Sequence, residues 1–248
     1  MSKSINIFGF HSVESLLRTN PESVIKVFIL NNRKDKRVNE LVNTLTNQKI
    51  TFSTTDKNDL DRIAKGEIHQ GVISEVILPP LLNEESLFKS ISDKSLKPLI
   101  LVLDSIQDPR NLGACLRSAN AAGVDYVVIN KDGSAPINAV VHKTSAGAIN
   151  SLKIFHVTNL SRTIKEMQKR GIWVIGLDGN SKSTIYDVNL TDATAIVMGA
   201  EGKGIRRLIK ENCDQIVTIP MSGNIESLNV SVATGIALFE SKRQREST

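Results

Sequence analysis

Residues 101–129, LVLDSIQDPRNLGACLRSANAAGVDYVVI, indicate the fold of the larger part of this chain. The apolar run over residues 99–103 is typical of a parallel strand that is buried on both faces. A helix is expected over residues 111–122 and a second apolar strand over residues 126–129. Because parallel strands are joined through helices, this strand–helix–strand order predicts an α/β domain.

The same alternation continues on both sides of this stretch. Towards the C-terminus the pattern predicts strands at residues 173–177, 195–198 and 215–219. It predicts helices at residues 160–170, 205–211 and 228–243. Towards the N-terminus it predicts strands at residues 24–30, 49–53 and 71–78. It predicts helices at residues 8–18, 37–48 and 56–64. Asp56 and Ser227 are expected to cap the helices that follow them, and Gly171 to end the helix at 160–170.

The domain boundaries follow from two prolines. Pro79 and Pro80 stop the strand at residues 71–78. The polar segment over residues 79–97 has weak periodicity, which favours a linker with one short helix. We therefore expect a small α/β domain over residues 1–78, the linker, and a second α/β domain over residues 98–248.

Composition excludes several classes of protein. The chain has 248 residues, of which 40% are hydrophobic and 23% charged, so it can bury a sizeable core. A net charge of +5 is compatible with a nucleic-acid partner but does not establish one. The two cysteines, Cys115 and Cys213, lack metal-ligand spacing, so no metal is expected. Without a signal peptide or a long apolar run, we expect a cytoplasmic protein with no membrane partner.

Three segments that follow apolar strands carry side chains suited to binding. The first contains Gly113, Ala114 and Arg117, whose guanidinium could reach a phosphate group. The second places Gly199, Gly202 and Gly204 between a strand and a helix, in a spacing that differs from nucleotide-binding glycine loops. The third, residues 226–229, opens the last helix. Singly, the first is as compatible with helix packing and the second with an ordinary turn. Plain helix capping is the commoner meaning of the third.

Together, and in this order, the three segments resemble the SpoU (TrmH-type) family of S-adenosylmethionine-dependent RNA 2′-O-ribose methyltransferases. The match consists of NLGACLR at 111–117, MGAEGKG at 198–204, IPM at 219–221 and SLNVSVA at 227–233. IFGFHSVESLL at 7–17 and IHQGVISEV at 68–76 are similar to the substrate-binding domain of one subgroup. That subgroup methylates a guanosine in the peptidyl-transferase P-site loop of 23S rRNA.

The resemblance implies a fold, a cofactor and partners. The fold is a trefoil-knotted α/β methyltransferase domain, preceded by an RNA-binding domain similar to ribosomal proteins that bind kinked RNA. The implied cofactor is S-adenosylmethionine, and the implied partners are 23S rRNA and a second copy of the chain, with the last helix near the dimer interface. The residues implied for the cofactor are Leu177, Gly179, Gly199, Gly202, Ile219, Met221, Leu228 and Val230.

The resemblance also implies catalytic residues. Arg117 is expected to bind the phosphate of the target nucleotide and to stabilise the developing alkoxide, because its high pKa makes it a poor general base. Asn111, Glu201 and Asn229 are expected to fix the arginine and the ribose. Near-attack positioning of the ribose 2′-oxygen then supplies much of the catalysis.

RNA capture is expected in the N-terminal domain. Its candidates are Arg33, Lys34, Lys36, Arg37, His11 and His69, with Arg110 in the second domain. A solvated charged turn is the commoner meaning of the basic run at residues 33–37. Aromatic residues make up only 4%, which favours recognition of RNA shape and backbone. The alternatives are the same chemistry on tRNA or another rRNA site, a non-catalytic ribosome-assembly protein, and, remotely, a nucleotide-dependent oxidoreductase.

Overall fold

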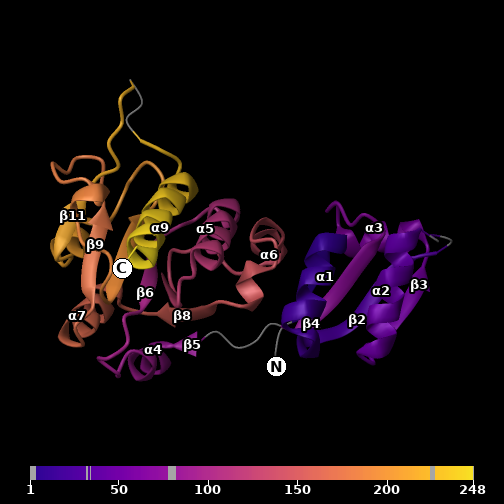
Figure 1. Ribbon diagram of the computed structural model, residues 1–248. Helices are drawn as coiled ribbons and strands as arrows, with labels where there is room; N and C mark the ends of the chain where they lie inside the picture. Colours follow the sequence, from indigo (N-terminus) through magenta and orange to yellow (C-terminus); the bar gives the residue numbers. More distant parts are fainter. Residues whose placement is uncertain (1–3, 32, 34, 78–81, 224–226, 248) are drawn as a thin grey trace. The chain divides into compact units, whose positions relative to one another are not determined.

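A computed structural model describes residues 4–31, 33, 35–77, 82–223 and 227–247 (Figure 1). The chain forms two compact units. The first comprises Met1–Pro80 with Ile137–Ser151, and the second Leu81–Pro136 with Leu152–Thr248.

The first unit is built on a four-stranded sheet in the order β1-β4-β2-β3, with β1 Ser4–Phe8, β2 Val24–Leu30, β3 Phe52–Thr55 and β4 Val72–Ile77. β4 runs antiparallel to β1 and β2, and β3 runs parallel to β2. The helices of this unit are α1 Phe10–Thr19, η1 Pro21–Ser23, α2 Lys36–Asn47, α3 Lys57–Ala64, α6 Ala139–Thr144 and η2 Ala148–Asn150. Its main core joins α1 and α2 to β2 through residues such as Phe10, Leu41 and Val27.

Two expectations for this unit are wrong in detail. Residues 4–8 form β1, although Phe8 was expected to begin a helix; Gly9, at φ 86°, separates that strand from α1. The strand expected at residues 49–53 begins only at Phe52, because Lys49 adopts a left-handed φ of 55° and Ile50 donates back to the Leu45 carbonyl. This closing turn uses the residues that the sequence pattern assigned to the strand.

The second unit contains a seven-stranded sheet in the order β11-β9-β10-β6-β7-β8-β5, and every pair is parallel. The strands are β5 Leu82–Asn83, β6 Leu99–Asp104, β7 Tyr126–Asn130, β8 Lys153–Val157, β9 Trp173–Leu177, β10 Thr194–Gly199 and β11 Gln215–Val217. The helices are α4 Glu84–Ser90, α5 Pro109–Ala122, α7 Leu160–Lys169, η3 Ile185–Asp187, α8 Arg207–Glu211 and α9 Val230–Glu246.

Helices cover both faces of this sheet, as the apolar strands require. Alternate strand residues such as Ile100, Val102 and Val197 pack with residues of α4, α7 and α8. Helices α5 and α9 pack against each other, and Figure 1 shows them side by side. Because β10 lies between β9 and β6, the strand order reverses at the β6–β10 pair. In open α/β sheets, ligands bind at the carboxyl ends of the strands where the order reverses.

The chain stretch assigned to a linker contributes to the second unit. Leu82 pairs with Phe155, so that β5 extends the sheet, and α4 buries Leu87 completely. Residues 79–81 of that stretch lie outside the described residues. Asn229 caps α9 by accepting a hydrogen bond from the Ser231 amide, whereas Ser227 was expected in that role. Asp56 caps α3 as expected, and Gly171 follows α7 at φ 85°.

Candidate functional site

A cavity of about 640 Å³ lies at the carboxyl ends of β9 and β10, beside the start of α9. Backbone and apolar side chains supply most of its lining. All eight residues that the sequence analysis assigned to the cofactor line it: Leu177, Gly179, Gly199, Gly202, Ile219, Met221, Leu228 and Val230. The structure therefore brings four separate stretches of the chain, at residues 177–180, 198–204, 218–221 and 227–233, to one hollow.

The loop that follows β10 forms one wall of the cavity and depends on its glycines. A Cβ atom on Gly199 would lie 2.0 Å from the Gly204 carbonyl carbon, so no side chain fits there. The Gly204 amide donates to the Ala200 carbonyl at 2.8 Å, which folds the loop back on itself. Gly202 and Gly204 adopt φ of 77° and 65°, a conformation that other residues rarely adopt. The glycine spacing thus shapes a narrow turn beside the cavity.

Three of the four expected catalytic residues form one hydrogen-bonded group. The Asn111 side-chain amide donates to Glu201 Oε2 at 2.8 Å. The Asn229 amide donates to Asn111 Oδ1 at 3.1 Å and to Glu201 Oε1 at 3.3 Å. Since these residues come from α5, the loop after β10 and the cap of α9, the group ties together the three segments singled out in the sequence.

Arg117 stands apart from this group. It is exposed on α5 and has no hydrogen bond or ion pair within the described part of the chain. Asn111, Glu201 and Asn229 were expected to fix this arginine, but within the described residues they hydrogen-bond to one another and not to Arg117. Its guanidinium is therefore available to another molecule.

Sequence reasoning missed an acidic residue in the cavity lining. Asp178 lies between Leu177 and Gly179, which were both identified. Burial acts to raise the pKa of Asp178, but the Lys210 ammonium at 2.9 Å and the Asn180 amide outweigh it, so the pKa is lowered. The other lining residues that were not assigned to the site are Asn180, Met198, Ala200, Lys203, Gly204, Thr218, Ser227 and Ala233. Their position after strand ends was the signal that could have identified most of them.

A second hollow, of about 670 Å³, lies in the first unit and collects three of the expected RNA-binding residues: Arg33, Arg37 and His69. The guanidinium carbons of Arg33 and Arg37 lie 4.7 and 4.9 Å from the centre of the Phe10 ring. Glu14 accepts two hydrogen bonds from Arg37, which lowers the pKa of Glu14 and raises that of Arg37. Both guanidinium groups thus lie within cation–π distance of one aromatic ring.

Hydrogen bonds orient His69 at the edge of this hollow. Its Nδ1 accepts from the Gly71 amide at 3.0 Å, and its Nε2 lies 2.9 Å from Asp61. Nε2 therefore carries the proton in the neutral ring. His11, Lys36 and Arg110 are exposed at other positions, and Lys34 lies outside the described residues.

Two negative findings concern the described residues. None of the helices in these ranges is long and apolar enough to cross a membrane. Within the same ranges, no group of three or more His, Cys, Asp or Glu side chains is arranged to hold a metal ion.

Comparisons with known proteins cover both units. Residues 98–239 match the model of the SpoU rRNA Methylase family, and residues 6–80 match the model of the RNA 2′-O ribose methyltransferase substrate-binding domain. A relative from Haemophilus ducreyi is 48% identical over 98% of both chains. One from Escherichia coli is 45% identical over 96% of this chain and 98% of its own. Both are named 23S rRNA (guanosine-2′-O-)-methyltransferase RlmB.

Solved structures show the same fold. The SpoU methyltransferase AviRb from Streptomyces viridochromogenes, in complex with the cofactor AdoMet, matches with a TM-score of 0.81 at 21% identity, over 99% of this chain and 92% of AviRb. The A. aeolicus TrmH/SpoU tRNA modifying enzyme matches with a TM-score of 0.56 at 32% identity, over 66% of this chain and 85% of its own. The family expected from the three segments is confirmed: this chain belongs to the SpoU rRNA methylase family.

Proposed function

We propose that this protein transfers a methyl group from S-adenosylmethionine to the ribose 2′-oxygen of a guanosine in 23S rRNA, in the peptidyl-transferase P-site loop. One observation carries the proposal: the donor-binding residues implied by the family line a single cavity, next to the hydrogen-bonded group Asn111, Glu201 and Asn229. The names of relatives at 45–48% identity over nearly the full chain support the same substrate.

The cavity fits S-adenosylmethionine in size and chemistry. Its volume of about 640 Å³ lies in the range of small-molecule sites. Backbone groups of the glycine-rich loop suit the adenine and the amino-acid part, and apolar side chains such as Ile219 and Leu228 suit the adenine ring. When bound, this cofactor supplies a methyl group on a sulfonium, which already has a good leaving group. The ionised Asp178, which is paired with Lys210, also places a carboxylate in the lining beside the positively charged donor.

The residues of the chain then supply positioning and electrostatic stabilisation. We assign the Asn111–Glu201–Asn229 group to orienting the ribose, because it is already fixed by three hydrogen bonds. We assign Arg117 to the phosphate of the target nucleotide and to the charge that develops on the 2′-oxygen. Its side chain is exposed and unpaired within the described residues, as this role requires.

We further propose that the active form is a homodimer, with α9 in the interface. Val232 and Phe239 of α9 are 50% and 48% exposed, and Ile236 lies between them at helical spacing. Exposed apolar stripes of this kind mark protein–protein contacts. A dimer would also give the exposed Arg117 a second chain to work with, since it has no partner among the Asn111–Glu201–Asn229 group in its own chain.

The family fold implies a trefoil knot in the methyltransferase domain, which we assign to residues 98–248, after an RNA-binding domain at 1–78. Within the segment between them, β5 and α4 pack with the second unit. Arg33, Arg37 and His69 of the first unit form the surface proposed for RNA capture. Lys34, Lys36, His11 and, from the second unit, Arg110 are proposed to contribute to it. We propose that the protein acts in the cytoplasm, where rRNA is processed.

Two measurements test the proposed function. Calorimetric titration of S-adenosylmethionine into the pure protein should show binding, whereas a non-catalytic assembly protein has no need of it. Ribose methylation mapped across rRNA and tRNA in cells lacking the protein should lack one guanosine mark in 23S rRNA. A lost tRNA mark, or a mark elsewhere in rRNA, would identify a different substrate for the same chemistry.

A further inference from the structure

A buried carboxylate lies directly behind the wall of the donor cavity. Asp104 ends β6 and is 0% exposed. Its Oδ2 accepts from the Arg206 amide at 2.9 Å, and its Oδ1 accepts from Arg206 Nε at 2.7 Å and from Ser105 Oγ at 3.2 Å. The half-exposed Arg206 guanidinium therefore neutralises a charge that water cannot reach.

Both ends of the glycine-rich loop meet at this residue. Gly199, where β10 ends and the loop begins, pairs in the sheet ladder with Asp104 itself. Arg206, where the loop passes into α8, is held by the Asp104 carboxylate through both backbone and side chain. The cavity-lining stretch at residues 199–204 is thus closed at its base by one acidic side chain.

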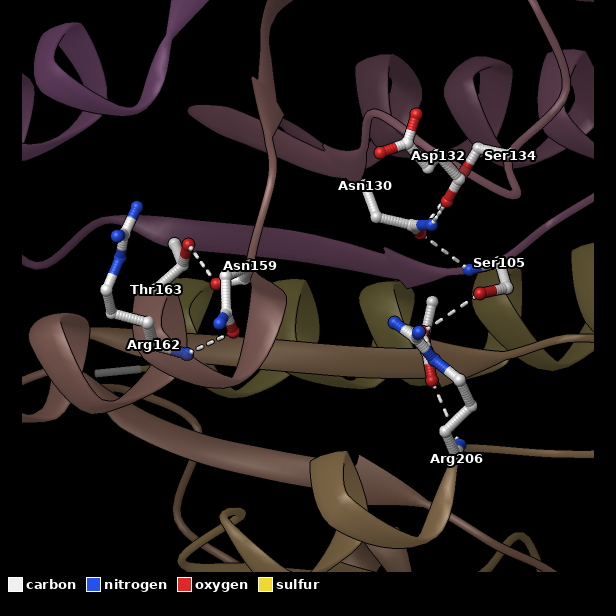
Figure 2. A network of polar contacts seen from close by, with 9 residues as sticks. Ser105, Asn130, Asp132, Ser134, Asn159, Arg162, Thr163 and Arg206 are labelled. Carbon is white, nitrogen blue, oxygen red and sulfur yellow. Dashed lines mark hydrogen bonds and ion pairs between the residues drawn. The ribbon is translucent and has the colours of Figure 1, made fainter.

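The strand end that carries Asp104 is itself held in an unusual conformation. Ser105 adopts φ 61°, and its amide donates to Asn130 Oδ1 at 2.8 Å (Figure 2). Ser134 donates to the same Asn130 oxygen at 2.9 Å, and the Asn130 amide donates to the Asp132 carbonyl. A strained residue persists only where its surroundings determine it strongly. This network therefore gives Asp104 a rigid base on β6 and β7.

We propose that Asp104 is a positioning residue for the methyl donor: it closes the loop at residues 199–206 in the shape that binds S-adenosylmethionine. The inference rests on the proposed donor binding in this cavity. If the loop opened, Asp104 would be left buried without its counterion, so the ion pair favours the closed loop. A loop that is closed before the donor arrives binds it more tightly, because apparent affinity scales with the population of the competent state.

The test is Asp104→Asn in the full-length protein. This change keeps the size of the side chain and one acceptor but removes the charge. The Kd and KM for S-adenosylmethionine should rise about tenfold, while kcat at saturating donor stays within about twofold, because the donor itself then closes the loop. Hydrogen exchange over residues 200–207 should be faster than in the unsubstituted protein. Arg206→Lys, which keeps the charge and the backbone bond, should show a smaller rise in Kd.

Glu84→Gln provides a matched control. Glu84 is also a mostly buried carboxylate, 18% exposed, paired with a half-exposed arginine, Arg162, but its pair joins α4 to α7. Its loss should lower the midpoint of thermal unfolding and leave donor binding and exchange at residues 200–207 unchanged. If Asp104→Asn and Arg206→Lys behave in the same way as this control, the positioning role is wrong. If the unsubstituted protein does not bind the donor at all, the proposed function fails and the inference fails with it.

Discussion

At the scale of single residues, Arg117 is the most direct test of the chemistry. Arg117→Ala should lower the single-turnover methylation rate at least ~100-fold. The change removes the guanidinium that is proposed to stabilise the negative charge developing on the 2′-oxygen. The residue is exposed and unpaired within the described chain, so the fold should not change. Rates are measured with saturating rRNA and donor, and the Kd of each is measured separately.

Arg117→Lys is the control for charge alone. It keeps the positive charge but loses the planar fork that binds phosphate through two bonds, so it should recover only part of the rate. A near-normal single-turnover rate in Arg117→Ala, with RNA and donor bound, would remove this residue from the mechanism.

His142 gives the protein an acid-sensitive position that is independent of the donor cavity. It is 2% exposed, its Nε2 has no hydrogen-bond partner within the described residues, and burial lowers its pKa to about 4. In the unfolded chain this histidine binds a proton near pH 6.5. The free energy of unfolding is therefore highest above about pH 6.5 and falls as the pH drops towards 4. The free energy of unfolding should fall by about 3 kcal/mol once the pH reaches the folded-state pKa of about 4.

The measurement is the free energy of unfolding in urea between pH 7.5 and pH 4.5, as approximate limits, for the unsubstituted protein and for His142→Leu. Leucine fills a similar space and cannot be protonated. The slope of the unfolding free energy against pH should therefore correspond to about one fewer proton taken up on unfolding in the variant. Equal slopes for the two proteins would show that His142 is accessible to protons in the folded state. His156, whose pKa burial and Lys131 also lower, accounts for part of any slope that remains.

At the scale of elements, the exposed face of α9 can be tested by oligomeric state. Val232→Asp with Phe239→Asp places two charges on the apolar stripe and should convert a dimer to a monomer in light scattering coupled to gel filtration. Leu96→Asp is a control of the same exposure, 49%, in the segment before β6. A monomeric unsubstituted protein, or a double variant that remains dimeric, would contradict the assignment of α9.

The sequence predicts the elements well where periodicity and composition agree, as in β6, α5, β9 and β10. It fails where a local hydrogen bond decides the conformation. Lys49 begins a turn rather than a strand because the Ile50 amide donates to the Leu45 carbonyl. Asn229 rather than Ser227 caps α9 because its side-chain oxygen Oδ1 accepts from the Ser231 amide. The spacing of apolar residues predicts neither hydrogen bond. Asn229 and Ser227 both also have side chains that can cap a helix.

The candidate cavity was predictable because its residues follow strand ends in recognisable motifs, and all eight assigned residues line it. Asp178 and Asp104 were missed for a physical reason. Each is a lone acidic residue at a strand end, and its importance comes from Lys210 or Arg206, more than thirty positions away in the chain. Such long-range ion pairs arise from the sheet order, in which β10 lies between β9 and β6.

At the scale of the whole molecule, the proposal divides labour between the two units, and this division can be measured. Arg33→Gln with Lys57→Gln removes two positive charges from the hollow of the first unit. RNA affinity should fall and its dependence on salt concentration should weaken, because fewer counterions are released on binding. The Kd for S-adenosylmethionine should not change, since the donor cavity lies in the second unit.

Lys165→Gln with Lys169→Gln removes the same net charge from α7 and separates a local contact from a general electrostatic effect. If both double variants weaken RNA binding equally, the hollow is not the capture site and only net charge matters. A selective loss in the first pair, with kcat at saturating RNA preserved, would instead mean that the first unit supplies binding alone. The chemistry would then belong to the second unit, where Asn111, Glu201 and Asn229 already meet without any contribution from the first.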